Sequence, residues 1–162
     1  MSTILLHITA WIIILCICAL VYAHFKNTPK GIMEFKTSME LSGLPVITFY
    51  QGNNKYNFLL DTGSSSSYLD SNSDMIRTEI PNVTADMIGI EGNRTECLVS
   101  VVDFYRDCMK YQCTMRVMDI GKTFAEIKNN YGISLSGILG NDFFVKYKYC
   151  LDFKNLVVYI NK

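Results

Sequence analysis

The chain has 162 residues, which is enough for one globular domain and a further segment. Its 15 basic and 15 acidic residues give no net charge, while 49% of the residues are hydrophobic and the mean hydropathy is +0.17. The sequence contains no basic cluster, RNP motif, zinc-finger pattern or P-loop, so we expect no nucleic-acid partner.

The N-terminal segment 4–23 is apolar and contains no Asp, Glu, Lys or Arg. A helix of this length would span a hydrocarbon core of about 30 Å, so we predict a single-pass transmembrane anchor in residues 1–25, in contact with membrane lipid through residues 4–23. Two alternatives stay open. Val21 and Ala23 suit a signal-peptide cleavage site, although a positive n-region is missing. A buried core helix is the other reading, and the apolar residues on all sides argue against it.

The lysines near this segment all follow it, and none precedes it. They are Lys26, Lys30 and Lys36. By the positive-inside rule, this asymmetry favours a cytoplasmic location for the C-terminal domain.

Residues 26–43 contain one proline and two glycines, and we predict a tether with a possible edge strand there. From residue 44 to residue 162 the apolar residues mostly recur at every second position, which is typical of half-buried strands. Two such runs, "LPVITFY" and "KYNFLLD", flank "QGNN", a hairpin signal.

Two short helices are predicted among the strands. One is "KTFAEIKNNYG", with Gly132 as its stop, and the other is "NDFFVKY", with Asn141 as its N-cap. With about eight short strands, the pattern predicts a small, mostly β domain with a closed, barrel-like or sandwiched sheet.

Four cysteines lie outside the apolar segment: Cys97, Cys108, Cys113 and Cys150. No C-x-x-C pair occurs, so we expect neither a zinc site nor a thioredoxin-type site, and no other metal or cofactor is predicted. The four could form two disulfides in an oxidising compartment or stay reduced inside the cell, and the sequence leaves both open.

The stretch "FLLDTGSSSSYLD", residues 58–70, places a carboxylate at the end of an apolar run. Asp61 is followed by Thr62, Gly63 and four serines, and Gly63 permits a close backbone approach or a positive φ. By itself D-T-G also fits an ordinary turn. A second motif, "GILGNDFF", follows at residues 137–144, where glycines flank two apolar residues ahead of a short helix.

Taken together, the two motifs and the glycine-containing segment between them resemble the retropepsin-like, single-lobed aspartic proteases over residues 44–160. "GILGNDFF" followed by "YCLDFKNLVVYI" also resembles the closing segment of bacterial and pepsin-like relatives, and with the apolar N-terminus the resemblance extends to a membrane-anchored, bacterial-type member. It implies an acid-protease lobe in which Asp61 is catalytic. Thr62 would bond across to a partner loop, Gly63 would admit backbone near the carboxylate, and the Ser64 hydroxyl could bond it.

The resemblance also assigns two further segments. "IGIEGN", residues 88–93, would be the flap that closes over a substrate, with Gly89, Ile90, Glu91 and Gly92 at its centre. Gly137, Ile138, Leu139 and Gly140 would support the catalytic loop from beneath. A plain hairpin and a plain core strand are the alternative readings.

Only one D-T-G occurs, and the chain after residue 43 is long enough for only one lobe. Asp119 in "VMDIG" resembles a second motif, but Lys122 follows it, so we interpret it as a turn residue. The predicted function is therefore that of an aspartic endopeptidase, a homodimer whose two Asp61 carboxylates activate a water against a peptide bond. The alternatives are a catalytically silent module that binds peptide or dimerises at a membrane, and a protease released by signal cleavage.

Overall fold

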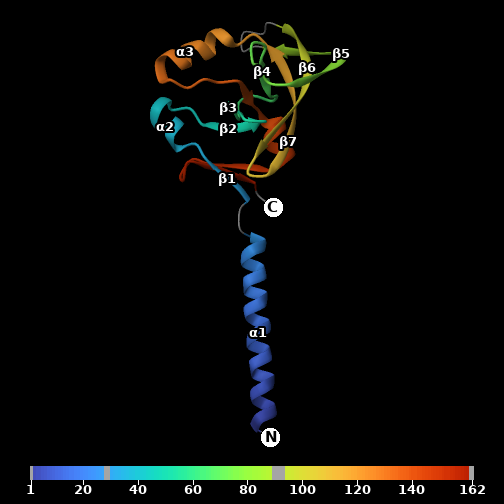
Figure 1. Cartoon of the computed structure of the whole chain (residues 1–162), viewed down its shortest axis with the longest axis vertical. Coiled ribbons are helices and arrows are strands. Elements are labelled where there is room, and N and C mark those ends of the chain that lie inside the picture. The colour runs from blue at the N-terminus through green and yellow to red at the C-terminus, as the bar shows by residue number, and fades with distance from the viewer. Residues whose placement is uncertain (1, 28–29, 89–93, 161–162) are drawn as a thin grey trace.

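The computed structural model describes residues 2–27, 30–88 and 94–160. The elements in chain order are α1 (Ser2–Asn27), β1 (Lys30–Glu34), α2 (Lys36–Ser42), β2 (Val46–Gln51), β3 (Asn54–Leu60), β4 (Tyr68–Asp70), β5 (Arg77–Ile88), β6 (Arg94–Arg106), β7 (Met109–Met118), α3 (Gly121–Tyr131), β8 (Gly137–Leu139), α4 (Asn141–Tyr147), β9 (Tyr149–Asp152) and β10 (Val157–Ile160). Figure 1 shows the strands gathered in one β-rich body, while α1 extends away from it as one straight helix.

Six strands of the larger sheet close on themselves. The strand order is β2-β3-β8-β4-β7-β6-β5, and β2 also pairs with β6 through Tyr50 and Tyr105. This pairing joins the two ends of the six-strand run, and β5 extends the sheet beyond the closure. The prediction of a mostly β fold with a small closed barrel is confirmed.

The strands form because apolar side chains recur at every second position and meet inside the barrel. In β3, Tyr56, Phe58 and Leu60 are buried, and β7 alternates in the same way. The centre of the core is a cluster of aromatic rings with centroids 4.6 to 6.1 Å apart. Its members are Phe49, Phe58, Phe104, Tyr111 and Phe143.

The segment 26–43 differs from the predicted tether. Residues 30–34 form the expected edge strand, β1, which pairs with β10 in a second sheet of order β1-β10-β9. The sequence reading missed α2, whose stop signal is Gly43. This glycine adopts φ 70° and donates its N–H to the Met39 carbonyl oxygen at 2.9 Å. Met33 and Phe35 are each 1% exposed, so this segment contributes to the core.

The two predicted helices are present as α3 and α4. Gly132 ends α3 as expected, with φ 71° and an N–H bond of 2.8 Å to the Lys128 carbonyl oxygen. Phe124 of α3 packs with Val46 and Leu135 in a second, smaller apolar cluster outside the barrel. With α2, three short helices accompany the strands in the described residues, where two were expected.

The described side chains of α1 between Trp11 and Tyr22 are exposed. In the described part of the chain, no helix has both the length and the apolar character needed to cross a membrane, and the predicted transmembrane anchor gains no support.

Candidate active site

Asp61 lies at the first position beyond β3, where the strand leaves the barrel. Its backbone N–H donates to the Leu139 carbonyl oxygen at 3.0 Å, which continues the parallel pairing of β3 with β8. Phe58 and Leu60 are 0% and 4% exposed, whereas Asp61 is half-buried. A core strand thus fixes the backbone of Asp61, while the Asp61 carboxylate remains accessible.

The D-T-G turn folds back onto the Asp61 side chain. Gly63 donates its N–H to Asp61 Oδ1 at 2.8 Å, and Ser64 donates its N–H to the Asp61 carbonyl oxygen at 3.2 Å. A β-carbon on residue 63 would lie 3.1 Å from Asp61 Oδ1, so glycine gives the carboxylate its close approach to the turn. Thr62 and Gly63 are exposed in the single chain, and the bond from Thr62 to a partner loop stays a prediction.

The predicted role of Ser64 is not realised. Its hydroxyl donates to the Ser66 carbonyl oxygen at 2.7 Å, so its one proton is used within the loop and not on the Asp61 carboxylate. The bend of the serine run brings the Ser66 carbonyl close to the Ser64 hydroxyl, and D-T-G spacing alone does not reveal that bend.

The "GILG" segment lies directly against this loop. A β-carbon on Gly137 would lie 2.4 Å from the Tyr68 carbonyl oxygen, and one on Gly140 would lie 2.4 Å from the Ser66 carbonyl oxygen. Real atoms do not approach so closely, so both positions require glycine for steric reasons. Between them, Ile138 and Leu139 pair with Leu59 and Leu60 of β3.

The start of α4 is hydrogen-bonded to the same loop through Ser67 and Asp142, which the sequence alone did not identify as site residues. Ser67, which is 0% exposed, donates its hydroxyl to Asp142 Oδ1 at 2.6 Å and its N–H to Asp142 Oδ2 at 3.0 Å. The same hydroxyl oxygen accepts the Gly140 N–H at 3.1 Å. The signal in the sequence was an aspartate two residues after Gly140, opposite a serine-rich loop.

The prediction that Asn141 is the N-cap of α4 is wrong. Gly140 occupies the N-cap position, and no side chain caps the helix there. The Asn141 side-chain amide instead donates to the Thr62 carbonyl oxygen at 2.9 Å, and its backbone N–H donates to the Ser64 carbonyl oxygen at 2.8 Å. Asn141 therefore belongs to the support of the Asp61 loop.

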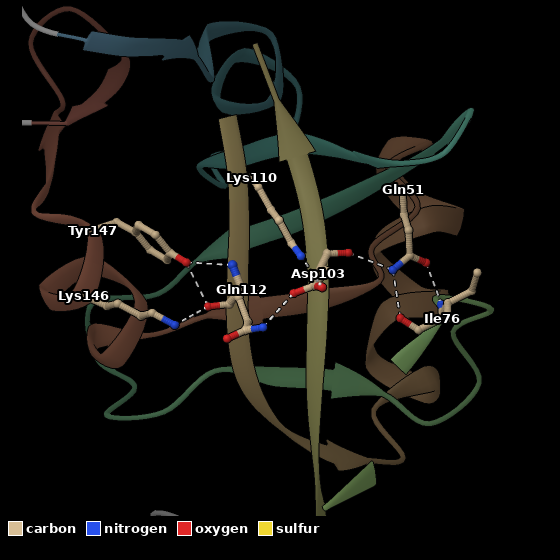
Figure 2. Close-up of polar contacts among 7 residues, drawn as sticks. All are labelled: Gln51, Ile76, Asp103, Lys110, Gln112, Lys146 and Tyr147. Atoms are coloured by element: carbon tan, nitrogen blue, oxygen red, sulfur yellow. Dashed lines mark hydrogen bonds and ion pairs between the residues drawn. The ribbon is translucent and has the colours of Figure 1, made fainter. Parts of the chain in front are cut away.

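The other end of α4 is tied to β7, as Figure 2 shows. The Tyr147 hydroxyl accepts the Gln112 N–H at 2.7 Å and donates to the Gln112 carbonyl oxygen at 2.9 Å. Lys146 Nζ donates to that same oxygen at 2.5 Å. Contacts at both of its ends therefore fix α4 relative to the barrel.

The same network continues across β6. Asp103 accepts from Lys110 Nζ at 2.7 Å and from Gln112 Nε2 at 3.1 Å (Figure 2). The hydrogen bond from Lys110 holds the pKa of the Asp103 carboxyl below its usual value. The Gln51 side chain bonds both the N–H and the carbonyl oxygen of Ile76, at 2.6 and 2.8 Å. These contacts are structural and lie apart from the Asp61 loop.

Asp119 is a turn residue, as predicted. It is exposed just beyond β7, and its Oδ1 accepts the Gly121 N–H at 3.2 Å where α3 begins. Asp119 therefore does not belong to a second catalytic loop.

The predicted flap residues Gly89, Ile90, Glu91 and Gly92 lie outside the described residues. On either side of these residues, β5 pairs with β6 in antiparallel register up to Ile88 and Arg94, a pairing that fits both the flap and the plain hairpin.

The described side chains bear on two expectations, that no metal site is present and that the cysteines are either paired or reduced. Among these residues, His, Cys, Asp and Glu nowhere gather in threes that could hold a metal ion. Cys108, Cys113 and Cys150 are thiols outside any disulfide.

Comparison with known proteins finds similarity among solved structures. No protein-family model matches the chain, and no curated protein matches it. Among solved structures, the chain is similar to EIAV protease in complex with the inhibitor HBY-793, with 19% sequence identity and a TM-score of 0.46. The similarity covers 70% of this chain and 96% of the EIAV protease chain.

Proposed function

We propose that this chain is an aspartic endopeptidase of the retropepsin type that acts as a homodimer with one Asp61 from each chain. The supporting observation is the set of contacts that hold Asp61 in place. A buried strand carries it, the Gly63 N–H orients one of its carboxylate oxygens, and the loop rests on a strand bounded by two obligatory glycines.

Two such carboxylates in one site would perform the chemistry without a metal or cofactor. Because like charges at close range do not both ionise, the pair shares one proton. The ionised carboxylate takes a proton from a water, and the water oxygen attacks the carbonyl carbon of the peptide. The protonated carboxyl donates a hydrogen bond to the carbonyl oxygen, and a proton then passes to the leaving amine as the C–N bond breaks.

In this proposal the second carboxylate comes from a second chain. Asp119 is committed to the turn before α3, and the sequence holds a single D-T-G. The exposure of Thr62 and Gly63 leaves the tip of the Asp61 loop open to a partner copy. In this proposal the partner's loop meets it there, with the Thr62 hydroxyl as the bonding group.

The β5–β6 hairpin supports a flap in this proposal. A lid over the substrate must move and must approach a peptide backbone, and the four residues Gly89, Ile90, Glu91 and Gly92 include two glycines that suit both needs.

A silent peptide-binding or dimerisation module on the same fold is the rival function. A module that only binds has no need of a carboxylate held by a backbone N–H at the end of a core strand, which favours the enzyme.

The test is hydrolysis of a diverse peptide mixture by the full chain, with and without pepstatin, beside the Asp61→Asn variant. Cleavage that pepstatin blocks and that the variant lacks supports the enzyme. Binding of peptides without cleavage by either protein supports the silent module.

Membrane attachment through residues 4–23 is a separate proposal, and it rests on the sequence alone. The run has no charged residue, and the lysines that follow it favour a cytoplasmic domain. A bacterial-type origin likewise rests on the sequence of the C-terminal segment.

A further inference from the structure

One peptide group connects Asp61 to the start of α4. The N–H of Gly63 donates to Asp61 Oδ1 at 2.8 Å. The carbonyl of the same peptide group belongs to Thr62, and its oxygen accepts from Asn141 Nδ2 at 2.9 Å. The carboxylate is thus bonded to one side of a peptide unit whose other side is bonded to Asn141.

This arrangement couples the hydrogen bond to Asp61 and the hydrogen bond from Asn141, both geometrically and electrostatically. A peptide unit is planar, with its N–H and C=O pointing in opposite directions, so fixing the direction of the C=O also fixes that of the N–H. A donor on the carbonyl oxygen also polarises the amide and strengthens the bond that its N–H makes.

We propose that Asn141 is a positioning residue for Asp61, acting through the Thr62–Gly63 peptide group. The inference deepens the proposed function and rests on it, because the orientation of Asp61 matters most if this carboxylate handles a proton of the attacking water. Asn141 does not touch the carboxylate, and its role is to hold the amide that does.

One further contact and the absence of a helix-cap bond favour this role over a purely local one. The Asn141 backbone N–H bonds the Ser64 carbonyl oxygen at 2.8 Å, so Asn141 holds the loop on both sides of Gly63. The helix itself does not use the Asn141 side chain, because the N-cap position belongs to Gly140 and carries no side-chain cap bond.

The first arm of the test needs no activity. In the ¹⁵N-labelled full chain, the Gly63 amide proton should resonate downfield because it bonds a carboxylate. The variant Asn141→Leu keeps the approximate size of the side chain and removes the donor, so this proton should move upfield. The variant Asn141→Gln keeps an amide donor and should restore much of the shift.

Asn155→Leu is the matched control, because Asn155 is also an exposed asparagine whose side-chain amide donates to an oxygen acceptor, here a carboxylate and not a backbone carbonyl. Its Nδ2 donates to Asp152 Oδ2 at 2.6 Å, in the turn between β9 and β10. This variant should leave the Gly63 amide proton unchanged.

The second arm is kinetic. Asn141→Leu should lower kcat by about ten- to a hundredfold with KM changed less than about twofold, because it misplaces a reacting group without removing a substrate contact. Asn141→Gln should recover most of kcat, and Asn155→Leu should match the unmodified chain.

The two arms separate the inference from the proposed function. A Gly63 amide proton that stays in place in Asn141→Leu overturns the inference, and so does an unchanged kcat in an active enzyme. If the unmodified chain cleaves no peptide while the Gly63 amide proton moves upfield as expected, the proposed function fails and the positioning of Asp61 by Asn141 stands.

Discussion

The carbonyl oxygen of Ser66 occupies the place where a side chain on Gly140 would begin, since a β-carbon there would lie 2.4 Å from it. The backbone of Gly140 is extended, with φ −98°, so the need for glycine is steric and not conformational. At this contact the loop that follows Asp61 packs directly against the end of β8.

We expect Gly140→Ala to lower the free energy of unfolding by about 1–3 kcal/mol, the usual cost of forcing an extra carbon into a packed site. Urea denaturation measures the loss. Ser65→Ala is the control, because Ser65 is exposed in the same loop and its change should stay within about 0.5 kcal/mol. Equal losses for the two variants would contradict the steric argument.

The bond between Ser67 and Asp142 should also be visible in stability. Ser67→Ala leaves the buried Gly140 N–H without its acceptor and should cost about 1–3 kcal/mol of unfolding free energy. Asp142→Ala removes the other partner of the same bond. In a double-mutant cycle the two losses should couple by about 0.5–3 kcal/mol, whereas strictly additive losses would show that the residues act independently.

If the site contains two copies of Asp61, mixing subunits should reveal it. In an equal mixture of unmodified and Asp61→Asn chains with full exchange, about one quarter of the dimers carry two unmodified chains. Peptidase activity per total chain should fall to about one quarter of the pure unmodified value, because a dimer with one carboxylate lacks its general acid or base. Retention of half the activity, once exchange is verified, would mean that each chain works alone.

Alkaline pH should destabilise the fold through Cys113. Burial raises the pKa of its thiol from the usual value of 9.0 to about 12. The native state thus keeps this proton where the unfolded state releases it, so the contribution to stability is complete below about pH 9 and is lost as the pH rises toward 12.

Between about pH 8 and pH 10 the unfolding free energy should therefore fall by about 1.4 kcal/mol more in the unmodified chain than in Cys113→Val. Chemical denaturation at the two pH values measures this. A pH dependence identical in both proteins would rule out Cys113 as the source.

The membrane proposal is tested by fractionation. If residues 4–23 anchor the chain, the full-length protein should stay in the membrane pellet after carbonate or high-salt washing, because neither treatment extracts a spanning helix. Full-length protein in the soluble fraction would reject the anchor. A shortened N-terminus in that fraction would favour signal cleavage.

The sequence predicted the parts of the fold that depend on local pattern. Alternation of buried residues identified strands such as β3, and a glycine after a helical segment identified the end of α3 at Gly132. Gly43 gives the same signal at the end of α2, a helix of seven residues that the interpretation of 26–43 as a tether does not predict.

In the candidate site, the sequence predicted the motifs but not the bonds between them. Asp61 and Gly140 could be assigned because their neighbours in sequence are unusual. The directions of Ser64 and Asn141 could not, because each depends on a backbone carbonyl that only the folded loop brings within reach. Neither the two-residue bond of Ser64 nor the long-range bond of Asn141 leaves a periodic pattern in the sequence.

The parallel pairing of Leu60 with Leu139 has a consequence for how the protein is made. The two residues are about 80 positions apart in the chain, and contacts from the later partner and from the start of α4 hold the Asp61 loop from outside. A ribosome releases Asp61 well before it releases residues 137–142, and distant parallel strands close slowly even in a complete chain. An emerging chain therefore carries Asp61 before these contacts exist, and the loop gains them only after residues 137–142 have been synthesised.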